Sequence, residues 1–390
     1  MGERANISFK SIVLSIAFLL LISSPYIAQR TNNIIKLCLE ILLIVILLST
    51  RKINKNAIKA CIPAFIFMLV SLYSTFRWSG LSSRLMNAGT TSFAYVLLFY
   101  LIVLYCKDNN RIVRKTIERN LIFYNVILDF FVLLTNGKGL GGLPEAVYLL
   151  GNKFMVSYFH MALLALFISN SKKRNINFYI KIILYALYSI VILRIADTMT
   201  GVIGIVFMIL GILILNKRRE IFKVLTNPAI VIVFFIGINA IFLFSNILLN
   251  NEFIMKFLMK YSHTDTLLSG RLPMYKLTIE SISNNYIWGY GINYDIVLST
   301  FGFGNPQNGL LKMMLDFGVV GTISFLWMMY SSFRNSKLIE SSISEGVILF
   351  IYSMLFCSLV EINIDILFYL FLTILSGLSN CYTSSSTKKS

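Results

Sequence analysis

Long apolar runs dominate this sequence and limit what it can fold into. Most are about 17–22 residues long, the length that an α-helix needs to cross the hydrocarbon core of a bilayer. They lack the alternation of transmembrane β-strands. Hydrophobic residues make up 57% of the chain and charged residues only 13%, against about 25% charged residues in soluble domains. The sequence therefore predicts an all-α, polytopic integral membrane protein.

The apolar runs predict about twelve transmembrane helices, at 10–28, 33–49, 58–76, 90–106, 118–135, 154–170, 177–194, 199–215, 229–247, 309–333, 345–361 and 363–379. They divide the chain into three parts. Residues 1–247 form an N-terminal transmembrane bundle of about nine spans. Residues 248–308 form one large loop with short amphipathic helices. Residues 309–390 form a C-terminal bundle of about three spans and a tail.

The distribution of Lys and Arg predicts the orientation. Most of the 35 basic residues lie in one alternating set of short connectors, around 51–59, 107–119, 172–174 and 217–223, and near both termini. The positive-inside rule places that set in the cytoplasm. The large loop, the Gly-rich connector 136–153 and the turn 197–201 then share the extracytoplasmic face. This bias also explains the net charge of +18, so we predict no nucleic-acid partner.

Several chemistries find no support in the motifs. The five cysteines form no CxxC pair, and no His, Cys and Asp cluster has metal-ligand spacing. There is no P-loop, and no GxGxxG follows a strand. We therefore predict neither a metal site nor a cofactor.

The large loop contains residues suited to a glycan or a diphosphate. Arg271 opens a predicted surface helix, and its guanidinium matches phosphate oxygens bidentately; the alternative is an interfacial anchor. Trp288 and Tyr290 are suited to stacking on sugar rings, although aromatic residues at this depth also form interfacial belts. Gln307 and Asn308 open the next span, where a helix N-terminus favours anions.

Ionisable residues at the outer ends of spans are costly and often functional. Lys153 and Arg194 are two of them, and Arg194 and Asp197 are spaced to pair on one helix face. Asp197, Glu361 and His160 are candidates for a general base. A lone histidine within a span is more often a packing residue.

These residues together suggest a family. The loop and the following span carry a pattern that resembles Wzy-type polysaccharide polymerases and, more distantly, O-antigen ligases: Gly270-Arg271, Trp288-Gly289 with Gly291, Asn308, and Gly318 with Gly321. The last two glycines are also typical of close helix packing. Residues 151–160 and 197–204 add to the resemblance. Two positions depart from it, because Gln307 stands where the ligase pattern has His and Met199 where many relatives carry Arg.

The resemblance implies a membrane glycosyltransferase on the outer face of the bacterial cytoplasmic membrane, with both termini cytoplasmic. It would polymerise oligosaccharide repeat units carried on undecaprenyl diphosphate into capsular, O-antigen or exopolysaccharide chains. Arg271 would stabilise the diphosphate, helped by Lys153 or Arg194. Flippase and chain-length regulator proteins would be its partners, besides the lipid bilayer. A flippase for the same lipid-linked glycan and an O-antigen-type ligase are the alternatives.

Overall fold

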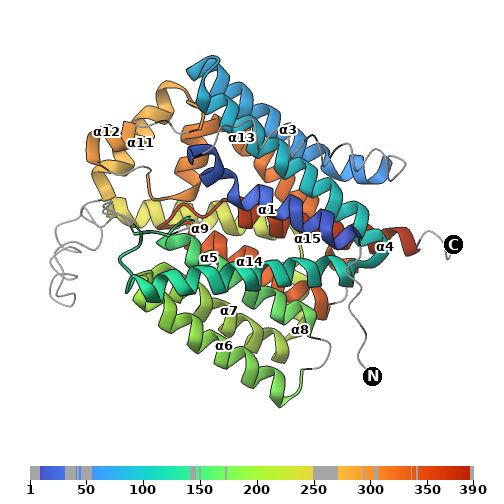
Figure 1. Ribbon diagram of the computed structural model, residues 1–390. Helices are drawn as coiled ribbons and strands as arrows, with labels where there is room; N and C mark the ends of the chain where they lie inside the picture. Colours follow the sequence, from blue (N-terminus) through green and yellow to red (C-terminus); the bar gives the residue numbers. More distant parts are fainter. Residues whose placement is uncertain are drawn as a thin grey trace.

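The computed structural model describes residues 9–30, 41, 44, 55–140, 146–148, 151–171, 174–248, 271–292, 294, 296–302, 306–334, 336–339 and 341–386. These residues are almost entirely helical (Figure 1). The helices are α1 (Phe9–Arg30), α3 (Lys55–Ser79), α4 (Ser83–Leu134), α5 (Lys153–Asn170), α6 (Ile176–Ile195), α7 (Met199–Lys217), α8 (Arg219–Leu225), α9 (Pro228–Leu248), α11 (Arg271–Asn284), α12 (Ile296–Phe301), α13 (Gly309–Phe333), the 3-10 turn η1 (Ser336–Leu338), α14 (Ser341–Cys357) and α15 (Ile366–Ser386).

Within these described ranges, six helices are long and apolar enough to cross a membrane, namely α3, α4, α5, α6, α7 and α13. The pair α8 and α9, bent by 79°, makes a seventh if it is taken as one span. Shorter apolar helices lie at Phe9–Leu21, Ile343–Cys357 and Ile366–Ser379. The predicted all-α, polytopic membrane fold is confirmed.

The count differs from the predicted twelve for identifiable reasons. The predicted span 33–49 lies outside the described residues, apart from 41 and 44. The predicted spans 90–106 and 118–135 form the two halves of α4, which meet at Asn109, the one non-helical residue between them (φ −160°, ψ 93°). Figure 1 shows the two halves running in different directions from this kink. Apart from Asn109, the basic connector between them is helical, as expected of a segment with neither Gly nor Pro.

Burial separates central from peripheral helices. Almost every residue of α5 from Val156 to Ser169 is buried, as expected of a helix that is apolar all round. It packs against α4 and α14. Helix α6 instead leaves large apolar side chains exposed, among them Leu184 and Leu187. Such an apolar outer face suits contact with lipid.

One short hairpin departs from the all-helical pattern. Strands β1 (Val147–Tyr148) and β2 (Gly151–Asn152) pair antiparallel within the Gly-rich connector 136–153. Tyr148 is buried, and its hydroxyl donates to the carbonyl of Gly137. This hydrogen bond ties the hairpin to the chain that follows α4 and places the start of α5.

Candidate active site at one end of the bundle

Hydrogen bonds join several connectors at one end of the bundle. Lys153 Nζ lies 3.0 Å from Asp197 Oδ2, linking the start of α5 to the turn after α6. The Cys357 thiol donates to the Thr200 carbonyl, and the Gly309 amide donates to the Ser358 carbonyl over 2.7 Å. The starts of α5, α7 and α13 therefore meet the end of α14. The structure thus brings together the Gly-rich connector, the 197–201 turn and the end of the large loop.

Helix α13 is broken close to this end. Gly318 has φ 61° and ψ −163°, outside the helical region. In a continuous helix the amides of Val319 and Val320 would donate to the carbonyls of Leu315 and Asp316. The break leaves all four backbone groups in need of other partners, because a buried, unpaired peptide group is costly.

The loop segment 286–291 supplies those partners. The amides of Val319 and Val320 donate to the carbonyls of Tyr286 and Ile287, over 2.8 and 3.1 Å. The carbonyls of Leu315 and Asp316 accept from the amides of Tyr290 and Gly291, over 2.9 and 2.7 Å. Segment 286–291 is therefore inserted into the broken helix and is held there by four backbone hydrogen bonds.

Two glycines make this insertion possible. A Cβ on Gly318 would lie 2.3 Å from the Ile287 carbonyl oxygen, and one on Gly289 would lie 2.5 Å from the Asp316 carbonyl carbon. Both contacts are with backbone, which cannot move aside as a flexible side chain can. The sequence pattern favoured helix packing for Gly318. The structure instead shows that this glycine provides a break and close approach of the loop backbone.

The aromatic residues of the segment are packed against neighbouring rings. Tyr290 is buried and stacks on Tyr294 with ring centroids 4.1 Å apart, while Trp78 meets it edge-on at 4.8 Å. The Tyr290 hydroxyl donates to the Ser281 carbonyl. Trp288 is half-buried and contacts Tyr73 edge-on. These contacts hold the inserted segment, and glycan stacking on Trp288 and Tyr290 stays a prediction.

Asn308 joins three elements at the start of α13. Its side-chain oxygen accepts from the Leu311 amide over 2.9 Å and so caps the helix. Its side-chain nitrogen donates to Asn239 Oδ1 of α9 and to the Leu359 carbonyl of the connector after α14. The side chain is fully buried. Gln307, just before it, has a left-handed backbone with φ 49° and stays partly exposed.

The ion pair at this end is made by Lys153, not by Arg194. Asp197 follows the last turn of α6 in a left-handed conformation (φ 54°), which turns its carboxylate toward Lys153. The predicted pairing of Arg194 with Asp197 on one helix face is therefore wrong, because the helix ends between them. Arg194 itself is exposed in that last turn. Lys153 and Asp197 come from connectors far apart in sequence.

The helix predicted to open at Arg271 is present as α11. Its buried residues Met274, Tyr275, Thr278, Ser281 and Ile282 recur at helical spacing and form one face. Tyr275 and Ile282 share an apolar cluster with residues of α13. Helix α11 is thereby fixed against the first turns of α13, and Arg271 stands at its first position.

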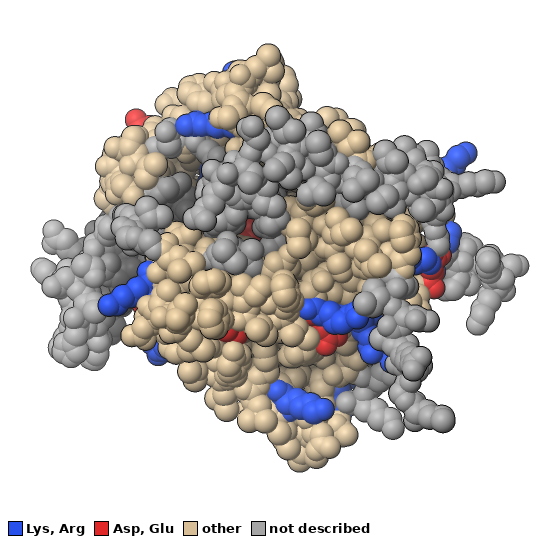
Figure 2. Space-filling view, in the orientation of Figure 1, with Lys and Arg blue, Asp and Glu red and all other residues tan. Residues whose placement is uncertain are grey.

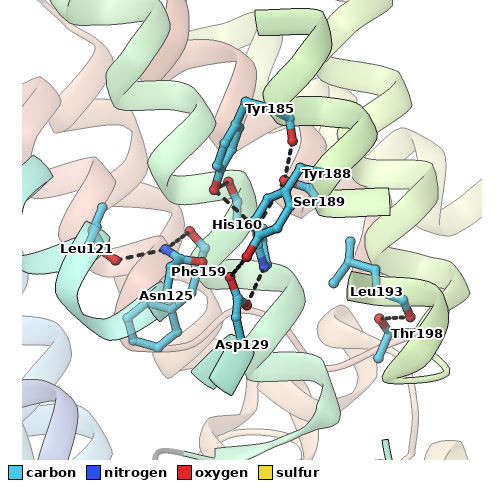
Figure 3. Close-up of polar contacts among 10 residues, drawn as sticks. All are labelled: Leu121, Asn125, Asp129, Phe159, His160, Tyr185, Tyr188, Ser189, Leu193 and Thr198. Carbon is cyan, nitrogen blue, oxygen red and sulfur yellow. Dashed lines mark hydrogen bonds and ion pairs between the residues drawn. The ribbon is translucent and has the colours of Figure 1, made fainter. Parts of the chain in front are cut away.

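His160 lies deeper and in a different environment (Figure 3). It is on α5, about 10 Å along the axis from Lys153 at 1.5 Å per residue, and it is fully buried. Its Nε2 lies 2.9 Å from Asp129 Oδ1 of α4, and its Nδ1 lies 3.0 Å from Ser189 Oγ of α6. The Tyr188 hydroxyl donates to the second Asp129 oxygen. Both ring nitrogens of His160 are thus occupied by side chains that join three helices.

The connector between α14 and α15 carries two carboxylates. Glu361 and Asp365 are both half-buried. Asp365 caps α15, since its Oδ1 accepts from the Leu367 amide over 3.0 Å. Burial raises the pKa of Asp365 to about 7. An Asp directly before an apolar run is also typical of a helix cap in the sequence.

Comparison with protein families identifies the segment that contains much of this site. Residues 184–326 match the model of the O-antigen ligase family. This segment is similar to the O-antigen ligase family. The match supports the resemblance to that superfamily and a glycan-processing function of the ligase or polymerase type in a multi-pass bacterial membrane protein. A comparison with curated proteins found no match to this chain.

The matched range has a clear structural meaning. It begins in α6, contains the Lys153-paired Asp197, and ends in α13 just beyond the break at Gly318. The inserted segment 286–291 and the cap at Asn308 both lie inside it. Lys153 and Glu361 lie outside the matched range and reach this end of the bundle through the fold. His160 also lies outside the matched range and is buried deeper in the bundle.

Proposed function

We propose that this protein polymerises lipid-diphosphate-linked oligosaccharide repeat units on the outer face of the cytoplasmic membrane. The observation that supports this most strongly is the O-antigen ligase-family match over residues 184–326. Members of this family are membrane glycosyltransferase-like enzymes. The match includes the broken helix α13 and the loop segment inserted into it. Irregular backbone within a membrane protein is tolerated where it lines a functional cavity or is buried in protein.

The proposed reaction is a glycosyl transfer between two lipid-linked glycans. The terminal hydroxyl oxygen of one repeat unit attacks the anomeric carbon of the growing chain. The bond between that carbon and the diphosphate oxygen breaks, and undecaprenyl diphosphate leaves with the bonding electrons. The hydroxyl proton passes to a base of the enzyme. The site must therefore stabilise negative charge on the diphosphate and accept one proton.

We assign the diphosphate to Arg271, with Lys153 as the second cation. Arg271 opens α11, which packs against the first turns of α13. Lys153 stands at the start of α5, at the same end of the bundle. The exposed partner of Lys153, Asp197, can be replaced by the more highly charged diphosphate.

We assign the base to the carboxylates after α14, with Asp365 first and Glu361 second. A general base works best when its pKa is near the operating pH, and burial brings the pKa of Asp365 to about 7. Asp197 is already paired with Lys153. His160 is buried well below the site with both ring nitrogens occupied, so it is better suited to holding helices together.

A ligase is the second candidate, because the matching family model is described as O-antigen ligase. A ligase would move a finished glycan from the lipid carrier to a different acceptor. The resemblance noted above has His where this chain has Gln307, and this difference favours the polymerase. Gln307 can donate and accept hydrogen bonds but cannot take up the proton.

The length of surface glycan in cells lacking this protein distinguishes the candidates. We expect single repeat units when the gene is deleted and long chains when it is restored. Long chains that stay on the lipid carrier would identify a ligase, and absence of any external glycan would identify a flippase.

Substitutions in α11 test the assignment of Arg271. Arg271→Ala should leave single repeat units, because one cation facing the leaving diphosphate is lost. Lys276→Ala is the matched control, since Lys276 is an exposed cation on the same helix. Chains of normal length from Arg271→Ala, at normal protein level, would refute its role.

A further inference from the structure

A large cavity lies away from the candidate active site. It has a volume of about 1040 Å³ and lies between the second half of α4, the end of α5 and the first turns of α6. Small-molecule sites usually measure about 300–1,000 Å³. Ser171 and Asn175 are part of its lining, and the charge pattern places the basic connector between α5 and α6 on the cytoplasmic side. The proposed glycosyl transfer makes no use of it.

The lining of the cavity is basic. Lys115 and Arg119 come from α4 and Lys181 from α6. Lys115 also attracts the Glu118 carboxylate three residues further along α4, and Lys181 makes no ion pair within the described part of the chain. Arg119 donates one N–H to Ser11 Oγ over 3.1 Å, which leaves other N–H groups of its guanidinium for a ligand. In the lower right part of Figure 2, blue side chains lie over the region where Figure 1 draws α4 and α6.

Glu118, the one acidic residue in the lining, is held by a network of hydrogen bonds. Asn170 Nδ2 donates to Glu118 Oε2. Asn170 is in turn fixed by Arg114, a buried guanidinium that donates to Asn170 Oδ1 over 2.8 Å and to the Ser169 carbonyl. Glu118 therefore has a polar partner of its own. The three cations outnumber it, and the cavity has a net positive charge.

The walls and surroundings of the cavity are apolar. Phe167, Phe178 and Ile182 contribute to the lining. Beyond it, two rows of exposed apolar side chains run along the helices toward the opposite end: Phe123, Val126 and Phe130 on α4, and Leu184, Tyr188 and Val191 on α6. A basic pocket that continues into apolar helix surfaces is typical of sites for anionic lipid headgroups.

We propose that this cavity binds the phosphate headgroup of an anionic membrane lipid. Lys115, Arg119 and Lys181 contact the phosphate. The acyl chains lie along the exposed faces of α4 and α6. Those apolar faces distinguish a lipid phosphate from a free phosphate ion, which would gain nothing from them.

Native mass spectrometry of the full-length protein in detergent tests this proposal. The probes are phosphatidylglycerol, which is anionic, and phosphatidylcholine, which has no net charge. The test variant is Lys115→Gln/Arg119→Gln/Lys181→Gln. The control is Lys217→Gln/Arg218→Gln/Arg219→Gln, which removes three exposed cations that do not line the cavity. A Lys115→Gln/Lys181→Gln variant keeps the contact between Arg119 and Ser11.

We expect the wild-type protein to retain phosphatidylglycerol in preference to phosphatidylcholine. Each Lys or Arg contributes about fivefold near an anionic surface, so the triple variant should bind phosphatidylglycerol about 100-fold more weakly. The double variant should lose about 25-fold, and the control should match wild type. Equal retention of both lipids, or equal loss in the control, would overturn the proposal.

Inorganic phosphate tests whether the cavity binds a lipid phosphate or a free phosphate ion. Millimolar phosphate is added to the wild-type protein without lipid, and thermal unfolding is followed. A lipid site predicts no shift in the unfolding temperature. A shift that disappears in the triple variant, without retention of phosphatidylglycerol, would overturn the lipid in favour of a soluble anion.

Discussion

The replacement Gly318→Ala tests whether the break in α13 depends on the absence of a side chain. An alanine there would have to adopt φ 61° and ψ −163°, a conformation that only glycine adopts readily. Its Cβ would also lie 2.3 Å from the Ile287 carbonyl oxygen. We therefore expect α13 to become a continuous helix and segment 286–291 to be expelled from the break.

The size of the effect follows from the hydrogen bonds. Expulsion loses the four backbone bonds between segment 286–291 and α13 and restores the two that a continuous helix would make. Losing two buried hydrogen bonds costs about 1–3 kcal/mol. Retaining the inserted state with alanine would instead cost about 1–3 kcal/mol in backbone strain before any clash. Loss of the packing around Tyr290 adds to the cost of expulsion, and the clash with the Ile287 carbonyl adds to the cost of retention. We therefore expect destabilisation of about 2–5 kcal/mol.

Gly302→Ala is the matched control. Gly302 also has a positive φ of 74°, but a Cβ built on it meets nothing within 4 Å. It should therefore show only the cost of a left-handed backbone, about 1–2 kcal/mol. Comparing the two variants separates the clash and the lost insertion from φ strain alone.

The measurement is thermal unfolding in detergent together with hydrogen–deuterium exchange. In Gly318→Ala the unfolding temperature should fall further than in Gly302→Ala. The amides of Tyr290 and Gly291 should exchange quickly, while those of Val319 and Val320 stay protected in the continuous helix. If both segments keep wild-type protection and the two variants unfold at the same temperature, the reasoning is refuted.

Three further predictions concern the same end of the bundle. Asn308→Ala should lower stability by about 2–4 kcal/mol, because it removes a helix cap and leaves buried partners unpaired. The control is Asn175→Ala, at the exposed cap of α6, which should lose only about 1 kcal/mol in the same unfolding assay. Asp365→Asn keeps a capping oxygen but cannot ionise. Because the pKa of Asp365 is raised, wild-type stability should fall as pH rises from the ordinary carboxyl pKa of about 4 to about 7. Across that range the difference in unfolding temperature between the variant and wild type should shift in favour of the variant, and above it the difference should stay constant. A difference that does not change between about pH 4 and 7 would contradict the pKa shift. Asp197→Asn should change stability by less than about 1 kcal/mol, because the Asp197 carboxylate of the ion pair is exposed and Asn tolerates a left-handed backbone. Shorter glycan chains in cells expressing this variant would therefore report on function rather than folding.

Much of the architecture could be predicted from local patterns. The length of the apolar runs indicated most spans, because crossing a bilayer sets a minimum number of apolar residues per helix. Arg271, with Pro273 in the first turn, marked the start of α11, and Asn308 marked the start of α13. Each of these signals depends on residues within one or two turns of one another. The division at 247 and 308, the orientation in the membrane and the roles of the site residues stay predictions.

The tertiary structure alone decided how distant segments meet. The insertion of segment 286–291 into α13 uses backbone groups, which every residue carries, so the side-chain pattern of α13 reads as one apolar span. Asp197 pairs with Lys153 rather than with its sequence neighbour Arg194, because the chain leaves the helix before Asp197. His160 meets Asp129 only because α4 and α5 pack side by side. The sequence by itself determined which segments become helices, since that choice rests on local hydrophobicity and capping; the partners of its polar groups depended on contacts that form only when the helices pack.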